Sequence, residues 1–347
     1  MNYSMISYIL GWIFNFEAAF MILPGITAII YREKNGLAFL ITMLICLTIG
    51  IPLTRRKRKS KVFHAKEGAV TVALSWLVLS IAGALPFIIS GSIPHPIDAI
   101  FETVSGFTTT GASILSDVEA LSHCMLIWRS FTHWIGGMGV LVFILCLLPL
   151  TGGYHMNLMK AESPGPSVSK LVPKVQSTAK ILYTIYIILT IVEIIFLLIG
   201  KMPLFDTLCL SFGTAGTGGF GIKNDSIASY STYNQVVITV FMILFGINFN
   251  AYYLLLTKKV MQAAKNEEVR YYLGIIGSLL IQEKCSQALE ELSSRLLSRW
   301  DPSLRLLDML PQISMCGRYF LRLFWLSLCL WEPVQEVQAA VSRYPVF

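Results

Sequence analysis

The sequence predicts an all-α polytopic membrane protein in which one module of helix, half-helix, loop and helix occurs twice. The chain is 55% hydrophobic and 14% charged, with a mean hydropathy of +0.66, whereas soluble domains carry about 25% charged residues. Its apolar residues gather in runs long enough to cross a bilayer. Two stretches rich in Thr and Gly, Asp98–Ser113 and Phe205–Gly221, lie at corresponding places between such runs.

Residues 1–54 are predicted to form two leading transmembrane helices. The spans Tyr8–Tyr31 and Gly36–Leu53 are joined by a short polar turn and followed by the basic run Arg55–Lys61. The positive-inside rule places this run in the cytoplasm, and with it the N-terminus. Because the run lies directly between membrane spans, the net charge of +7 points to membrane lipids as partners and not to nucleic acid.

The first module is expected over residues 68–150. An outward span, Gly68–Ser90, precedes Pro94–Phe107, which is too short to cross again and has apolar residues at helical spacing. We interpret it as a half-helix that dips into the membrane from outside. The returning span Met125–Leu150 contains HWIGGMG, whose small residues allow close helix packing.

The second module is expected over residues 181–259, after a polar cytoplasmic linker at 151–180. It contains the outward span Ile181–Gly200, a short segment Pro203–Ser211, a Gly/Thr loop Gly213–Gly221 and the inward span Gln235–Thr257. Residues 260–281 look like the start of a third module. The chain therefore reads as parallel repeats of one unit.

The two loops have the composition of a cation filter. A pore that passes a bare cation replaces its water shell with rings of backbone carbonyls, and glycine permits the dihedral angles that turn successive carbonyls to one axis. The negative C-terminal end of each half-helix favours a cation at the loop. The predicted filter residues are Thr109, Thr110 and Gly111 in the first loop and Thr217, Gly218 and Gly219 in the second.

Ionisable residues in or near apolar segments are costly and usually functional; here these are Glu17, Glu102, Glu193 and Asp206. Glu102 and Asp206 belong to the half-helices, and either attract cations at the outer mouth or fix the half-helix by hydrogen bonds. Lys223 follows the second loop and is expected at the outer vestibule, while Arg129 and His133 lie near the first. Gly246 and Asn248 interrupt the last span, where a kink or gate is expected.

These residues resemble a known family. The segments SGFTTTGAS, HWIGGMGVLVF, AESPGPS and SFGTAGTGGFGIKNDS are similar to those of the membrane subunit of bacterial Trk-type potassium-uptake systems, in the Trk/Ktr/HKT superfamily. The resemblance implies potassium-channel-like helix–pore loop–helix repeats, four in a complete protein, with two present here. It also implies a homodimer in the inner membrane that binds a cytosolic nucleotide-binding regulatory subunit. K+ at the filter carbonyls would be the transported ion, with no covalently bound cofactor.

Residues 282–347 depart from this pattern, because from Gln282 the sequence becomes polar and loses helical periodicity. A regulatory C-terminal domain is one explanation and a shifted reading frame is the other. Rereading Pro302–Gln312 one base out of register, with favourable codons, allows SIITTTGYATA, which resembles a third TTTG loop. We therefore expect an out-of-frame tail and an unclosed pore in the chain as it stands.

Two other classes compete with potassium uptake. A non-conducting membrane scaffold or assembly subunit would need the same helices but no ion path. An intramembrane metal enzyme could use His123, His133 and Glu102, but the sequence contains no HExxH or GxSxG pattern to support it. The sequence favours a transporter over both.

The out-of-frame interpretation is tested by resequencing the gene around the codon for Leu280. We expect a one-base shift whose correction restores a third TTTG loop downstream. An intact frame that runs into the present tail would contradict this interpretation.

Overall fold

A computed structural model describes residues 3–55, 65–139, 175–256, 261–262 and 267–278. The chain divides into two units, residues 1–270 and 271–347. All helices named below belong to the first unit, and of the second only the helical residues 271–278 are described. The predicted tail at 282–347 and the segment AESPGPS lie outside the described residues.

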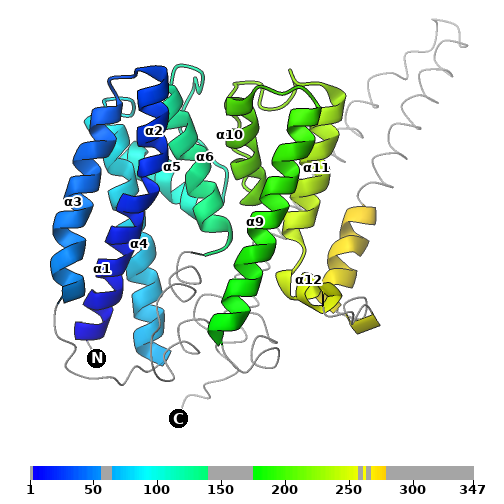
Figure 1. Cartoon of the computed structure of the whole chain (residues 1–347), viewed down its shortest axis with the longest axis horizontal. Helices are drawn as coiled ribbons and strands as arrows, with labels where there is room; N and C mark the ends of the chain where they lie inside the picture. The colour runs from blue at the N-terminus through cyan, green and yellow to red at the C-terminus, as the bar shows by residue number, and fades with distance from the viewer. Residues whose placement is uncertain (1–2, 56–64, 140–174, 257–260, 263–266, 279–347) are drawn as a thin grey trace, which may run out of the picture. The chain divides into compact units, whose positions relative to one another are not determined.

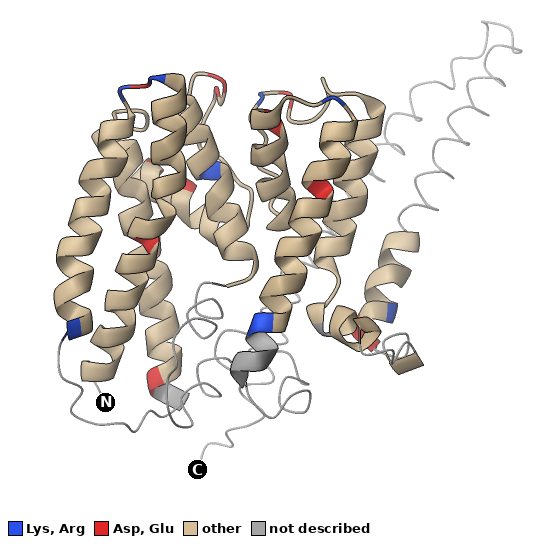
Figure 2. Cartoon of the chain, viewed as in Figure 1, with Lys and Arg blue, Asp and Glu red and all other residues tan. Residues whose placement is uncertain are grey.

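The regular elements of the described part are all helices, joined by loops (Figure 1). Its named helices are α1 (Tyr3–Phe20), α2 (Ile22–Tyr31), α3 (Gly36–Arg55), α4 (Ala65–Ile89), α5 (Pro96–Phe107), α6 (His123–Gly137), α9 (Val175–Ile199), α10 (Leu204–Ala215), α11 (Thr232–Gly246) and α12 (Phe249–Leu256). Within it, four stretches are long and apolar enough to cross a membrane: Tyr3–Tyr31, Gly36–Arg55, Glu67–Ile89 and Lys180–Ile199. Figure 2 shows the charged residues mostly near the ends of the helices, with few along their middle.

The two short helices α5 and α10 are each 12 residues long, about 18 Å at 1.5 Å per residue, which is too little to cross the roughly 30 Å hydrocarbon core. Helix α5 packs between α4 and α6, and α10 packs against α6, α9 and α11. Helix α5 begins at Pro96 and ends at Phe107, and α10 begins at Leu204 and ends at Ala215, so the two have equal length. The second half-helix is longer than predicted, because Gly213 and Ala215 are still helical.

The helix is interrupted in both predicted long spans, and in the second the interruption lies where Gly246 and Asn248 predicted a kink. The span Met125–Leu150 ends as a helix at Gly137, where Gly139 takes a left-handed φ of 75° and its N–H bonds Gly136 O at 2.9 Å. The span Gln235–Thr257 is divided into α11 and α12 by the extended residue Ile247 (φ −73°, ψ 136°). In both cases residues that favour non-helical backbone lie inside an apolar run; residues 140–150 of the first span lie outside the described residues.

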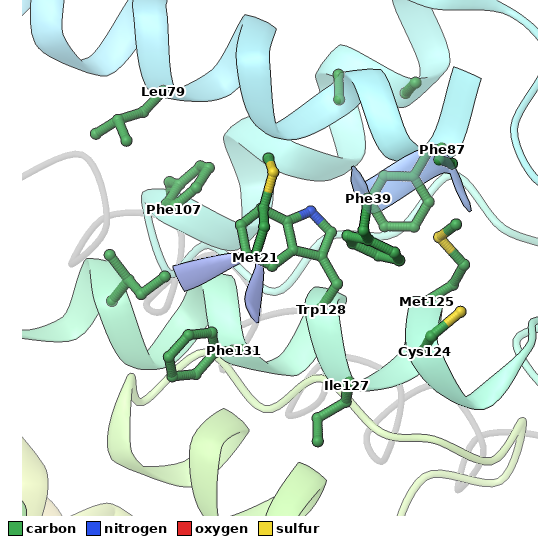
Figure 3. Packing of buried hydrophobic residues seen from close by; sticks show 14 of the residues in the cluster. Met21, Phe39, Leu79, Phe87, Phe107, Cys124, Met125, Ile127, Trp128 and Phe131 are labelled. Carbon is green, nitrogen blue, oxygen red and sulfur yellow. The ribbon is translucent and has the colours of Figure 1, made fainter. Parts of the chain in front are cut away.

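Trp128 on α6 forms the centre of the main core (Figure 3). Its ring meets Phe39 of α3 and Phe107 of α5 edge to face, at centroid distances of 6.1 and 6.4 Å. Its indole N–H donates to Gly83 O of α4 at 3.0 Å. One buried side chain therefore joins a leading helix to three helices of the first module through van der Waals packing, which is what holds helices together in a membrane.

Glu33, in the turn between α2 and α3, ties the leading helices to the start of α6. Its carboxylate accepts hydrogen bonds from the N–H groups of His123 (2.8 Å) and Cys124 (3.0 Å) and pairs with His123 Nδ1 at 2.9 Å. Partial burial favours the neutral carboxyl, but these hydrogen bonds outweigh it and hold the pKa of Glu33 below its ordinary value. The turn thus caps the free N–H groups of α6.

Glu33→Gln should lower the thermal unfolding midpoint in detergent at pH 7, by an amount corresponding to about 1 kcal/mol, typical of a lost helix cap. Because the folded-state pKa is depressed, the stabilisation is present above the unfolded value of about 4.3 and is lost as the pH falls through the folded value. The difference between wild type and variant should therefore shrink below about pH 4. A difference that is constant over the whole pH range would show that the carboxylate charge has no part in the cap.

Candidate functional site

The two Thr/Gly loops share one backbone conformation. Thr109 and Thr217 have φ angles of 55° and 56°, and Gly111 and Gly219 have φ angles of 74° and 76°. A threonine in the left-handed region is uncommon and strained. Its occurrence at the same step after both half-helices therefore indicates that the surrounding structure imposes this conformation.

Each loop is bonded back to the end of its own half-helix. Thr110 N donates to Ser105 O at 2.9 Å, and Gly218 N donates to Gly213 O at 3.2 Å. The negative ends of α5 and α10 therefore lie directly before the residues predicted as a filter.

The two loops also approach each other directly. A Cβ added to Gly111 would collide with the carbonyl oxygen of Gly218, and one added to Gly218 would collide with the ring of His133. On α6, a Cβ at Gly136 would collide with the carbonyl of Phe107, and one at Gly137 would lie 2.8 Å from Gly216 Cα. The small residues of HWIGGMG thus let α6 lie against the ends of both half-helices.

A buried ion pair connects the half-helix α5 to both loops. Arg129 Nε lies 2.5 Å from Glu102 Oε1, with the two side chains 3% and 1% exposed. Glu102 also accepts hydrogen bonds from Ser113 Oγ (3.0 Å) and Ile114 N (2.9 Å), beyond the first loop. Arg129 Nη1 donates to Gly221 O at 2.8 Å, beyond the second loop. The pair fixes where the chain leaves each loop.

Phe220, directly after the second loop, lies between two cationic or polar side chains of α6. The Arg129 guanidinium is 3.6 Å from its ring centroid, and the His133 imidazole stacks on it at 3.9 Å with an interplanar angle of 14°. This arrangement holds the second loop against α6 by a cation–π contact and ring stacking.

A smaller polar group lies around Tyr230, in the segment between the second loop and α11. Its hydroxyl donates to Asp206 Oδ2 at 2.9 Å, and Lys223 Nζ lies 4.3 Å from its ring centroid. Nearby, the Asn224 amide donates to Asp117 Oδ1 at 2.8 Å and thereby holds the pKa of Asp117 below its ordinary value. Asn224 links the segments that follow the two loops.

The break between α11 and α12 lies at Gly246 and Asn248, where the sequence predicted a kink or gate. Gly246 ends α11, and Tyr252 of α12 donates from its hydroxyl to Leu244 O at 2.6 Å across the break. Asn248 Nδ2 donates to Glu268 Oε2.

The structure brings together residues of both predicted loops and separates other candidates. Of the two roles left open for Glu102, its contacts favour fixing the half-helix, since both oxygens accept hydrogen bonds. The trio proposed for a metal enzyme is not assembled: His123 pairs with Glu33, His133 stacks on Phe220 and Glu102 binds Arg129. Among the described residues, no group of three His, Cys, Asp or Glu side chains could hold a metal ion. The Glu102–Arg129 pair and the role of Phe220 were missed, although two opposite charges in apolar segments were a usable signal.

Together these features define a polytopic α-helical membrane protein with two short helices, each followed by a strained Thr/Gly loop. A family model described as "Cation transport protein" (TrkH) matches residues 35–277. The chain belongs to the TrkH family of cation transport proteins.

Named relatives agree with this assignment. The Trk system potassium uptake protein TrkH of Salmonella typhimurium (strain LT2) is 36% identical over 286 residues, 81% of this chain and 59% of the relative. TrkG of Escherichia coli (strain K12) is 32% identical over 277 residues, 78% of this chain and 56% of the relative. The crystal structure of the potassium transporter TrkH from Vibrio parahaemolyticus matches with a TM-score of 0.63 and 28% identity, covering 78% of this chain and 54% of that one. The chain thus spans just over half the length of these relatives.

Arg129→Gln should lower the unfolding midpoint sharply, because removal of one partner leaves Glu102 as an uncompensated buried charge, which costs about 3–5 kcal/mol. The double variant Arg129→Gln with Glu102→Gln should recover part of this loss, since it buries two neutral amides of similar shape. The measurement is a double-mutant cycle by thermal unfolding in detergent. Additive losses in the double variant would show that the two side chains do not interact.

Proposed function

We propose that this chain takes part in potassium uptake across the inner membrane, with Thr109, Thr110 and Gly111 and their counterparts Thr217, Gly218 and Gly219 lining a cation path. The observation that carries the proposal is the common left-handed conformation of two adjacent loops, each placed at the negative end of a short helix. The chain performs no covalent chemistry, and K+ is its transported ion.

The physical basis is replacement of the ion's water shell by backbone carbonyls. The positive φ angles turn successive peptide groups in ways that ordinary β or α backbone does not allow. Threonine hydroxyls supply further oxygen atoms, and no carboxylate ligand is required, which suits a weakly hydrated monovalent ion better than Ca²⁺ or Mg²⁺. The Glu102–Arg129 pair holds both loops at a fixed distance from the ion.

Potassium is chosen because the relatives in Salmonella and Escherichia are named potassium uptake proteins. Because these relatives are named as parts of a Trk system, we propose that this chain also associates with other Trk components. We propose a homodimer with a cytosolic nucleotide-binding regulatory subunit and a cytoplasmic N-terminus. The break at Gly246–Asn248 is proposed as a gate, and Asp206 and Lys223 as parts of the outer vestibule.

The proposal is tested with a chimaera in which residues 1–278 replace the matching part of Escherichia coli TrkH, so that the relative supplies the rest of its own length. The chimaera, expressed in a strain that lacks its own potassium uptake, should restore growth at low potassium and take up rubidium. A chimaera that reaches the membrane in normal amount without transporting rubidium would instead support a non-conducting scaffold or assembly role.

Gly219→Ala in this chimaera should reduce rubidium uptake about tenfold or more, because a side chain at a positive φ strains the loop by about 1–2 kcal/mol at the point where carbonyls meet the ion. Gly91→Ala is the matched control. Gly91 has a φ of 73°, close to the 76° of Gly219, and a Cβ at either position meets nothing closer than 3.8 Å. The two variants carry the same backbone strain, so equal losses of uptake would show that the effect is structural and not specific to the loop.

A further inference from the structure

One buried carboxyl group lies near a side chain from the last turn of each short helix. Glu193 of α9 is 0% exposed and interacts with the hydroxyl of Thr214, in the last turn of α10. Glu17 of α1 is 1% exposed. Its Oε1 lies 3.2 Å from the point that a Cβ on Gly83 would occupy, and that point is 2.8 Å from the ring of Phe107, the last residue of α5.

The two carboxyl groups occupy equivalent places although they come from different helices. Helices α4 and α9 are the outward helices of the two modules, and each is 25 residues long. Helix α4 ends at Ile89 and α9 at Ile199. Counted back from these ends, Gly83 and Glu193 occupy the same position. The second module thus carries the carboxyl on its own outward helix. The first has a glycine there, and the leading helix α1 fills the gap with Glu17.

By distance and angle, no described residue donates a hydrogen bond to the oxygen atoms of either carboxyl group. The Thr214 hydroxyl, which faces Glu193, donates to Leu210 O at 2.8 Å instead. Among the described residues, Cys46 interacts electrostatically with Glu17, and Tyr186 with Glu193; neither supplies a positive charge. Buried polar groups left without partners require an explanation, and ionisable groups inside a membrane mark ion or proton sites.

We propose that Glu17 and Glu193 are two equivalent proton-binding sites whose charge state sets how strongly the adjoining loop holds a cation. The inference rests on the proposed function. The C-terminal end of each short helix carries about half a negative charge, and an ionised carboxyl group behind it adds a full one. Protonation removes that charge. By linkage, a cation in the loop and a proton on the carboxyl group weaken each other's binding by the same factor.

The test uses the purified full chain in detergent. The thermal unfolding midpoint is measured while rubidium chloride replaces choline chloride at constant ionic strength, at a series of pH values between about 5 and 9, a range in which buried carboxyl groups titrate. In the wild type, the rubidium concentration that gives half of the maximal stabilisation should rise about fivefold or more from the alkaline to the acidic end. The variant with Glu17→Gln and Glu193→Gln should show the acidic value at every pH, because an amide carries no charge.

Relocating the carboxyl group gives a sharper test. In the Glu193→Gln background, Glu17→Ala should remove the remaining pH dependence, and adding Gly83→Glu should restore it, since the new side chain starts where Glu193 starts in the second module. Asp98→Asn, at the opposite end of α5, is the control and should leave the pH dependence unchanged.

Each remaining outcome has one meaning. Wild-type protein that rubidium does not stabilise at any pH would overturn the proposed cation path itself. Rubidium stabilisation that does not depend on pH, or a pH dependence that survives in the double glutamine variant, would leave the path in place and overturn the role of the two carboxyl groups.

Discussion

The pair between Glu102 and Arg129 is the interaction on which the candidate site depends. Its two side chains, buried between α5 and α6, reach residues beyond both loops, Ser113 and Ile114 after the first and Gly221 after the second. A buried ion pair is stabilising only where further hydrogen bonds satisfy its remaining donors and acceptors. Here those further bonds are made to the chain leaving the loops, so the same bonds that help to offset the cost of burying the charges also order the site.

Around this pair, glycines let the backbone of α6 lie directly against the ends of the short helices, where larger side chains would keep them apart. Gly136, Gly137 and Gly218 bring α6 against the ends of both short helices, and Phe220 is held between Arg129 and His133. Lipid offers apolar surface as readily as protein does, so helices in a membrane associate through such close contacts. The strained φ angles at Thr109 and Thr217 persist because this rigid frame surrounds them.

Much of the architecture could be predicted, with errors of a definite kind. The two short helices were placed within a few residues, since apolar length and helical spacing are local properties. The helix end before Gly139 was not predicted, because hydropathy does not register where the backbone leaves the helix. The break at Ile247 lies where Gly246 and Asn248 predicted a kink. The small residues before Gly139 were read as packing residues; Gly136 and Gly137 do pack closely, and the helix also ends there.

The sequence by itself determined the class of protein and the position of its two loops, because the length of apolar runs, the charge distribution and the Thr/Gly content are local properties of the sequence. Only the tertiary structure decided which charges meet. Glu102 finds Arg129 on another helix, and Glu17 of the leading helix reaches the place that Glu193 occupies in the second module. These partners are far apart in sequence, and no periodicity records a contact that exists only after the helices have packed.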